Sequence, residues 1–199
     1  QPFNLTVINF LILPLFFYLI IFIKKKSKSI YRKKPFRKNL FIAGSSFGFG
    51  FYLSSLHWIV NSLTFDDSLK FLIPLGLIVI PLFLSLFVSL VTLIIGPFLK
   101  INFTSITLFS GALAFSDYLR SNILTGFPWN LWAYSFSSTT EIIQIINKTG
   151  LFAFNLLSIT IFMLPALLFV KINLLKKILL LTIIPIVLFS SYIYGNHSI

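Results

Sequence analysis

Long apolar runs alternate with short polar or basic interruptions along most of the chain. About 20 apolar residues cross the hydrocarbon core of a bilayer as a helix, and six runs have roughly that length. We therefore predict an all-α fold, a polytopic bundle of six transmembrane helices. The predicted spans are residues 5–23, 39–63, 69–99, 101–119, 150–170 and 174–194. The fourth is the least apolar, and the third is the longest, with three prolines expected to kink it: Pro74, Pro81 and Pro97.

The composition excludes a soluble globule. Of the 199 residues, 57% are hydrophobic and only 10% are charged, and the mean hydropathy is +0.98. A chain of this size could not bury so many apolar side chains in a water-soluble core. Lipid is therefore the expected solvent, and we find neither a soluble domain nor an internal repeat.

The charge pattern predicts how the chain lies in the membrane. The net charge is +12, and many of the basic residues fall in the loop 24–38 between two apolar runs. Such a loop favours the cytoplasmic face and anionic lipid head groups, and not nucleic acid, as its surroundings. Alternation of the spans puts the basic residues of the later loops on the same side, namely Lys100, Lys171, Lys176 and Lys177. The loop 120–149 then lies on the outer side, together with Lys70, Arg120 and Lys148.

Within that outer loop, the stretch TTEIIQIINKTG (139–150) predicts a short helix in the membrane interface. Thr139 or Thr140 is expected to cap it, with Glu141 favouring its N-terminal end. Further upstream, Gly44 and Gly48 form a small-xxx-small pattern that predicts close helix packing, with a ligand groove as the alternative. His57, near the outer end of the same run, is interpreted as an interfacial residue and not as a base or ligand.

Two outer features are candidates for function. Asp117 and Arg120 share a helix face and predict a structural ion pair; in the alternative, Arg120 presents its guanidinium to a lipid phosphate. The hexamer TGFPWN (125–130) breaks regular structure at head-group depth, where irregular backbone must be buried in protein or line a wet cavity. We interpret it as the wall of an outward-facing site, although each aromatic ring alone is typical of a membrane-interface anchor.

Catalytic chemistry is missing from the chain. It contains no cysteine, so it has no disulfide, no thiolate metal site and no thiol nucleophile. The four acidic residues are scattered, His57 and His197 are far apart in sequence, and no phosphate-binding loop or metal-ligand spacing is found. We predict no catalytic residue, no metal and no cofactor.

The stretch DYLRSNILTGFPWNLWAYS (117–135) resembles the membrane domain of apolipoprotein N-acyltransferases, which show an acidic residue, Leu-Arg-Gly and Thr-Gly-Phe-Pro-Trp at this spacing. The segments FGFGFYLSSLHWIVNSL (47–63) and TGLFAFNLL (149–157) are similar to the same family. Asp117 stands where Glu is usual, and Ser121 replaces the glycine after the arginine.

The resemblance implies a multi-pass protein of the bacterial inner membrane. Such an enzyme transfers an acyl chain from a membrane phospholipid, the donor, to the N-terminal diacylglyceryl-cysteine of a lipoprotein, the acceptor. It also implies that the chemistry belongs to a periplasmic nitrilase-like domain with a Glu-Lys-Cys triad, which this chain lacks. The chain, which begins with Gln1, is then expected to be a fragment holding the second to seventh spans, inactive alone. The substrate-binding residues expected at its outer rim are Arg120, Phe127, Pro128, Trp129 and Asn130. The alternative is a non-enzymatic membrane scaffold or a small permease.

Overall fold

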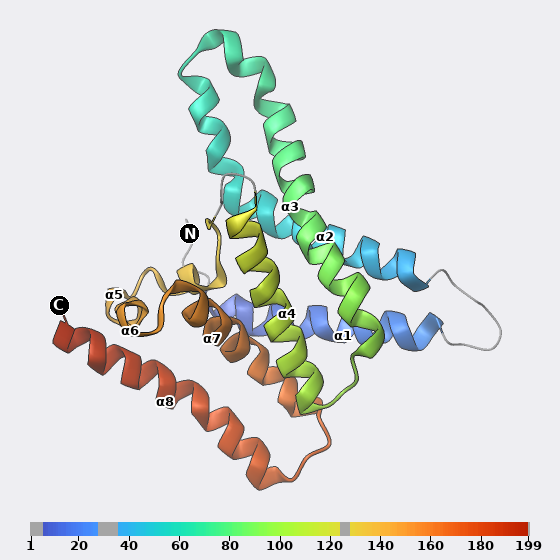
Figure 1. The fold of residues 1–199 in the computed structure, drawn as a ribbon, viewed down its shortest axis with the longest axis vertical. Helices are drawn as coiled ribbons and strands as arrows, with labels where there is room; N and C mark the ends of the chain where they lie inside the picture. The colour runs from blue at the N-terminus through green and yellow to red at the C-terminus, as the bar shows by residue number, and fades with distance from the viewer. Residues whose placement is uncertain (1–5, 28–35, 124–127, 199) are drawn as a thin grey trace.

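The computed structural model describes residues 6–27, 36–123 and 128–198, and within these ranges the regular structure is entirely helical (Figure 1). The α-helices are α1 (Asn9–Ser27), α2 (Phe36–Leu56), α3 (Ile73–Ile95), α4 (Phe103–Asn122), α5 (Thr140–Ile143), α6 (Ile146–Thr149), α7 (Leu151–Met163) and α8 (Leu174–Ser198). The 3-10 helices are η1 (Thr6–Ile8), η2 (His57–Thr64), η3 (Asp67–Leu72), η4 (Gly96–Phe98), η5 (Trp132–Phe136) and η6 (Leu164–Phe169).

Four helical segments among the described residues are long and apolar enough to cross a bilayer. They are Thr6–Ser27, Asp67–Phe98, Leu151–Phe169 and Leu174–His197. The all-helical prediction and the membrane assignment are thereby confirmed. Helices α2 and α4 are long enough but less apolar: α2 carries Arg37 and Lys38 near its start and several glycines and serines, and α4 carries Asp117 and Arg120 near its end. The count of six spans therefore stays a prediction.

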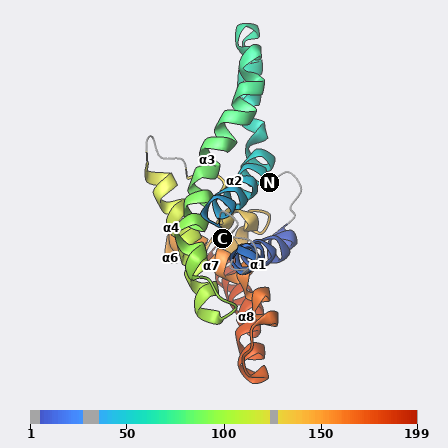
Figure 2. The same cartoon turned by 90° about the vertical axis from the view of Figure 1, so that its right-hand side faces the viewer.

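Helices α2 and α3 form a long hairpin. Its far end, made of η2 and η3, extends beyond the remaining helices in both views (Figures 1 and 2). Asp66 begins η3 by accepting a hydrogen bond from the Ser68 amide at 2.9 Å, which satisfies one of the free N–H groups of that helix start. Pro81 lies inside α3, whereas Pro74 and Pro97 lie in the first turns of α3 and η4, where proline is well tolerated.

The core is centred on α7, which packs between α1 and α4. Phe154, Ile159 and Phe162 of α7 are fully buried. The ring of Phe162 stacks on Phe136 of η5, with centroids 5.4 Å apart. At the start of α1, the Asn9 amide donates to the Ser135 hydroxyl of η5 at 2.9 Å. The beginning of α1 and the segment 128–136 therefore lie together at one end of the bundle, beside α7.

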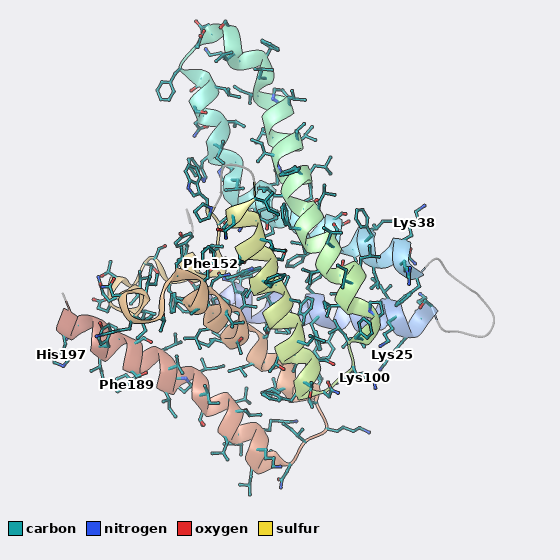
Figure 3. The ribbon with its side chains drawn as sticks, viewed as in Figure 1. Lys25, Lys38, Lys100, Phe152, Phe189 and His197 are labelled. Atoms are coloured by element: carbon teal, nitrogen blue, oxygen red, sulfur yellow. The ribbon has the colours of Figure 1, made fainter. Side chains whose placement is uncertain are left out.

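Basic residues gather at the opposite end of the bundle. Lys24, at the end of α1, donates to the carbonyl of Leu99 at 2.8 Å, so this helix end touches the α3–α4 link. Figure 3 shows Lys25, Lys38 and Lys100 on one side of the molecule, away from His197 near the C-terminus. This grouping is the one expected if these ends share the cytoplasmic face.

The predicted interfacial helix at 139–150 is in fact two short helices, α5 and α6. Thr139 occupies the N-cap position of α5, but its side chain makes no capping hydrogen bond. Helix α8 packs directly on α5 at Gly195, where an added Cβ would lie 1.9 Å from the carbonyl oxygen of Glu141. This contact covers one side of the segment, so it is a packed part of the fold.

Candidate functional site

A buried charged pair lies at the end of α4. One amino group of the Arg120 guanidinium is 3.2 Å from Oδ1 of Asp117, one helical turn earlier. The two residues are only 2% and 6% exposed. Charges buried in this way are costly unless they are paired and hydrogen-bonded, so the surrounding polar groups decide whether the pair is tolerated.

Asn155 of α7 supplies the second partner of Asp117. Its side-chain amide donates to Oδ2 of Asp117 at 2.9 Å, and its Oδ1 accepts from the backbone N–H of Ala133 in η5 at 3.1 Å. Asn155 is fully buried. Asn155 is not among the predicted site residues, although a lone amide inside the apolar run 151–163 is a signal, because polar side chains at such depth usually have a specific partner.

Arg120 connects this pair to the turn at residues 128–130, the part of the TGFPWN stretch that the structure describes. Its other amino group donates to the backbone carbonyl of Trp129 at 2.9 Å, and the guanidinium lies over the ring of Tyr52 in α2, 5.3 Å from the ring centre. Such a cation–π contact adds to the stabilisation of a desolvated arginine. The guanidinium therefore holds the turn against α2 and α4. That it meets a lipid phosphate stays a prediction.

The turn itself has an unusual backbone. Asn130 has a φ of 60°, in the left-handed region, which asparagine tolerates better than most residues. Its side-chain amide donates to the hydroxyl of Ser55 at 2.6 Å, and the Ser55 hydroxyl donates to the carbonyl of Phe51. The strained residue is thus fixed to the C-terminal end of α2.

Two half-exposed tryptophans lie side by side at this turn. The rings of Trp129 and Trp58 are stacked, with centroids 5.3 Å apart and planes inclined by 19°, and both are close to half exposed. Pro128 beside them is partly buried, and Phe127 lies outside the described residues. Indole rings favour the boundary between water and hydrocarbon, and the stacked pair forms an exposed amphipathic surface.

The hydroxyl of Tyr134, farther along the same segment, has a shifted pKa. Burial raises its pKa, and the positive charge of Arg120 opposes this increase less strongly. The phenol therefore stays protonated at neutral pH. Together, these groups position backbone and aromatic rings; with no cysteine in the chain, a thiol nucleophile is not among them.

Comparisons with known proteins show that the sequence of this chain is similar to one family. Residues 1–164 match the family model for the apolipoprotein N-acyltransferase N-terminal domain. The chain is 33% identical over 172 residues to the apolipoprotein N-acyltransferase of Brucella melitensis, covering 84% of this chain and 31% of that protein. The corresponding protein of Rhodopseudomonas palustris is 30% identical over 169 residues, covering 84% of this chain and 30% of the relative.

The chain thus spans about a third of the length of these curated relatives, and it matches them over most of its own length. No solved structure matches the chain.

Proposed function

We propose that the chain is the membrane domain of a phospholipid:apolipoprotein N-acyltransferase, because it belongs to the apolipoprotein N-acyltransferase family through that family's N-terminal domain. In the proposed reaction, the ester bond of an acyl chain in a membrane phospholipid is cleaved, a lysophospholipid is released, and the acyl group forms an amide with the amino group of a diacylglyceryl-cysteine. That cysteine is the N-terminal residue of a bacterial lipoprotein. The chain supplies the membrane scaffold at which both lipidated substrates are held.

The observation that carries the proposal is the fixed turn at Trp129. The guanidinium of Arg120, paired with Asp117, and the amide of Asn130 bind this turn to α4 and α2. A rigid, half-exposed aromatic surface at head-group depth suits the positioning of a lipid ester near a reacting group. In this proposal, Trp129, Pro128 and Asn130 form the rim of the site, and Phe127 is included from the sequence alone.

The covalent chemistry is assigned to a part of the protein outside these 199 residues. A thioester acyl-enzyme needs a cysteine nucleophile, and the chain has none. We assign that step to a nitrilase-like domain on the periplasmic side, next to the Trp129 turn. The chain alone is then expected to bind lipid without transferring acyl groups.

The proposed location is the bacterial inner membrane, with six spans. Helices α2 and α4 then cross the bilayer in addition to the four segments that are apolar enough by composition. The loop 24–38 faces the cytoplasm and the Trp129 turn faces the periplasm. The family match favours this function over a small permease or a scaffold.

Replacement of Trp129 in the intact enzyme tests the proposal. Trp129→Ala removes half of the stacked pair without touching the buried ion pair. We expect roughly a tenfold loss of kcat/KM, equivalent to about 1.4 kcal/mol of transition-state stabilisation. The measurement is N-acylation of a diacylglyceryl lipopeptide in phosphatidylethanolamine vesicles. Phe98→Ala, an exposed ring in η4 at the other end of the bundle, is the matched control. A wild-type rate in Trp129→Ala would contradict the proposal.

Arg120→Lys separates two roles of the arginine in the same assay. Lysine keeps the positive charge but loses the planar fork that reaches Asp117 and the Trp129 carbonyl together. Loss of activity in Arg120→Lys supports positioning of the turn by the guanidinium. Retained activity in Arg120→Lys, with loss in Arg120→Ala, supports direct attraction of a phosphate.

A further inference from the structure

An apolar groove runs between α3 and α4 on the surface of the bundle. Its volume is about 390 Å³, within the range of roughly 300–1,000 Å³ that is usual for small-ligand sites. Helix α3 contributes Leu90, Val91 and Ile94, and helix α4 contributes Ala112, Ser116 and Leu119. A shallower recess, lined in part by Gly111, continues the groove along α4.

The groove is continuous with a surface that faces lipid. One wall belongs to the segment Asp67–Phe98, which is long and apolar enough to cross a bilayer. Leu90, Ile94 and Phe115 along the groove are about half exposed or more. In a bilayer, the molecules that contact such side chains are lipid chains, and an unfilled groove would lose the dispersion contacts that a hydrocarbon chain provides.

The chemistry of the lining selects a hydrocarbon. Ser116 is the one polar side chain of the lining, and its hydroxyl already donates to the carbonyl of Phe87 in α3 at 3.2 Å. The polar groups of a ligand would therefore be desolvated with little compensation from the groove. An alkyl chain has no such cost.

The length of α4 along the groove matches the thickness of one bilayer leaflet. From Ala112 to the end of α4 at Asn122 the helix rises about 15 Å, half of the roughly 30 Å hydrocarbon core. Ser116 and Leu119, which line the groove, alternate along α4 with Asp117 and Arg120, which hold the Trp129 turn. A lipid with its chain in the groove would thus have its ester end at the depth of that turn.

We propose that the α3–α4 groove binds one acyl chain of a phospholipid, with the ester end toward the Trp129 turn. The geometry and the lining of the groove are by themselves the support for its occupancy by a lipid chain. The assignment of this lipid as the acyl donor rests on the proposed function.

Photo-crosslinking of the chain tests the occupancy. The chain is reconstituted in phosphatidylethanolamine vesicles that contain a phospholipid with a diazirine in its acyl chain, and adducts are mapped by mass spectrometry. We expect adducts at Leu90, Ile94 and Leu119 to exceed those at Ile186 and Phe189, exposed residues of α8, by roughly threefold or more, the ratio for a modest binding preference. Equal labelling of the groove and α8 would overturn the proposal.

A filled groove gives the complementary test. Ala112→Phe puts a ring into the groove and should lower labelling of Leu90 and Ile94 about threefold. Gly50→Phe in α2 is the matched control, because a Cβ there meets nothing within 4 Å. If Ala112→Phe fails to insert, Gly111→Leu replaces it, since the Cβ of residue 111 also meets open space. Unchanged groove labelling in the filled variant would overturn the proposal.

Activity of the intact enzyme separates this inference from the proposed function. Slower acyl transfer in Ala112→Phe supports the groove lipid as the donor. A wild-type rate, with groove labelling lost, overturns the donor assignment and leaves the binding site in place. A wild-type rate in Trp129→Ala contradicts the proposed function and leaves the labelling result unaffected.

Discussion

Asp117 and Arg120 place opposite charges where almost no solvent reaches them. The arrangement is tolerated because each charge has a further partner: Asn155 for the carboxylate and the Trp129 carbonyl for the guanidinium. Removing one member of such a pair leaves an uncompensated buried charge, whereas replacing both with apolar residues is often nearly neutral. The stability of this region therefore depends on the pair as a unit.

We expect Asp117→Ala to lower the free energy of unfolding by about 3–5 kcal/mol, since Arg120 is left buried without its carboxylate. The double variant Asp117→Leu/Arg120→Met should cost much less. Asp67→Ala is the matched control, because Asp67 pairs with Lys70 at the same spacing but both side chains are exposed; its effect should stay within about 1 kcal/mol. Unfolding in detergent micelles measures all three. Similar losses for Asp117→Ala and Asp67→Ala would show that burial does not matter here.

At the scale of elements, small residues set the contact between α2 and α3. Gly44 and Gly48 face Ser85, Ser89 and Thr92 of α3. Hydroxyl groups form hydrogen bonds across this seam between α2 and α3. The hydroxyls of Ser45 and Ser89 are 2.7 Å apart, and the hydroxyl of Thr92 donates to the carbonyl of Leu40 at 2.8 Å. Close backbones and hydrogen bonds between helices replace the hydrophobic driving force that is missing in lipid.

Gly44→Leu should separate α2 from α3. A Cβ at residue 44 would lie 2.6 Å from the Cα of Ser89, and backbone cannot move aside as a side chain can. We expect a loss of about 1–3 kcal/mol in unfolding free energy from this overpacking. Gly50→Leu, on the open side of α2, should have little effect. The same detergent unfolding measurement compares them, and equal effects would rule out the seam as the cause.

The sequence predicts elements better than it predicts their partners. Apolar length is sufficient for α1, α3, α7 and α8, because a bilayer selects helices by length and hydropathy alone. The spacing of Asp117 and Arg120 puts both on one helix face, and their side chains meet there. Asn155 is 38 residues away from Asp117, and only the packing of α7 on α4 brings them together. The contact of Gly195 in α8 with Glu141 in α5 likewise joins segments that lie far apart in the sequence.

At the scale of the whole molecule, the charge distribution and the helix packing both distinguish the same two ends of the bundle. The end of α1 and the α3–α4 link meet where Lys24 contacts Leu99. At the other end, the start of α1 contacts η5 through Asn9 and Ser135, close along the chain to the Trp129 turn. An outer-leaflet lipid reaches the α3–α4 groove only if the Trp129 end faces the periplasm.

Cysteine labelling tests this orientation directly, because the chain has no cysteine of its own. Ser62→Cys in η2 and Lys148→Cys in α6 change exposed residues on the proposed periplasmic side. Lys100→Cys and Lys171→Cys do the same on the proposed cytoplasmic side. In spheroplasts, a membrane-impermeant maleimide should label the first pair, and it should label the second pair only after permeabilisation. The positive-inside preference predicts this pattern. The reverse pattern would put the Trp129 turn in the cytoplasm, where it could not hold a lipid for a periplasmic acyl transfer.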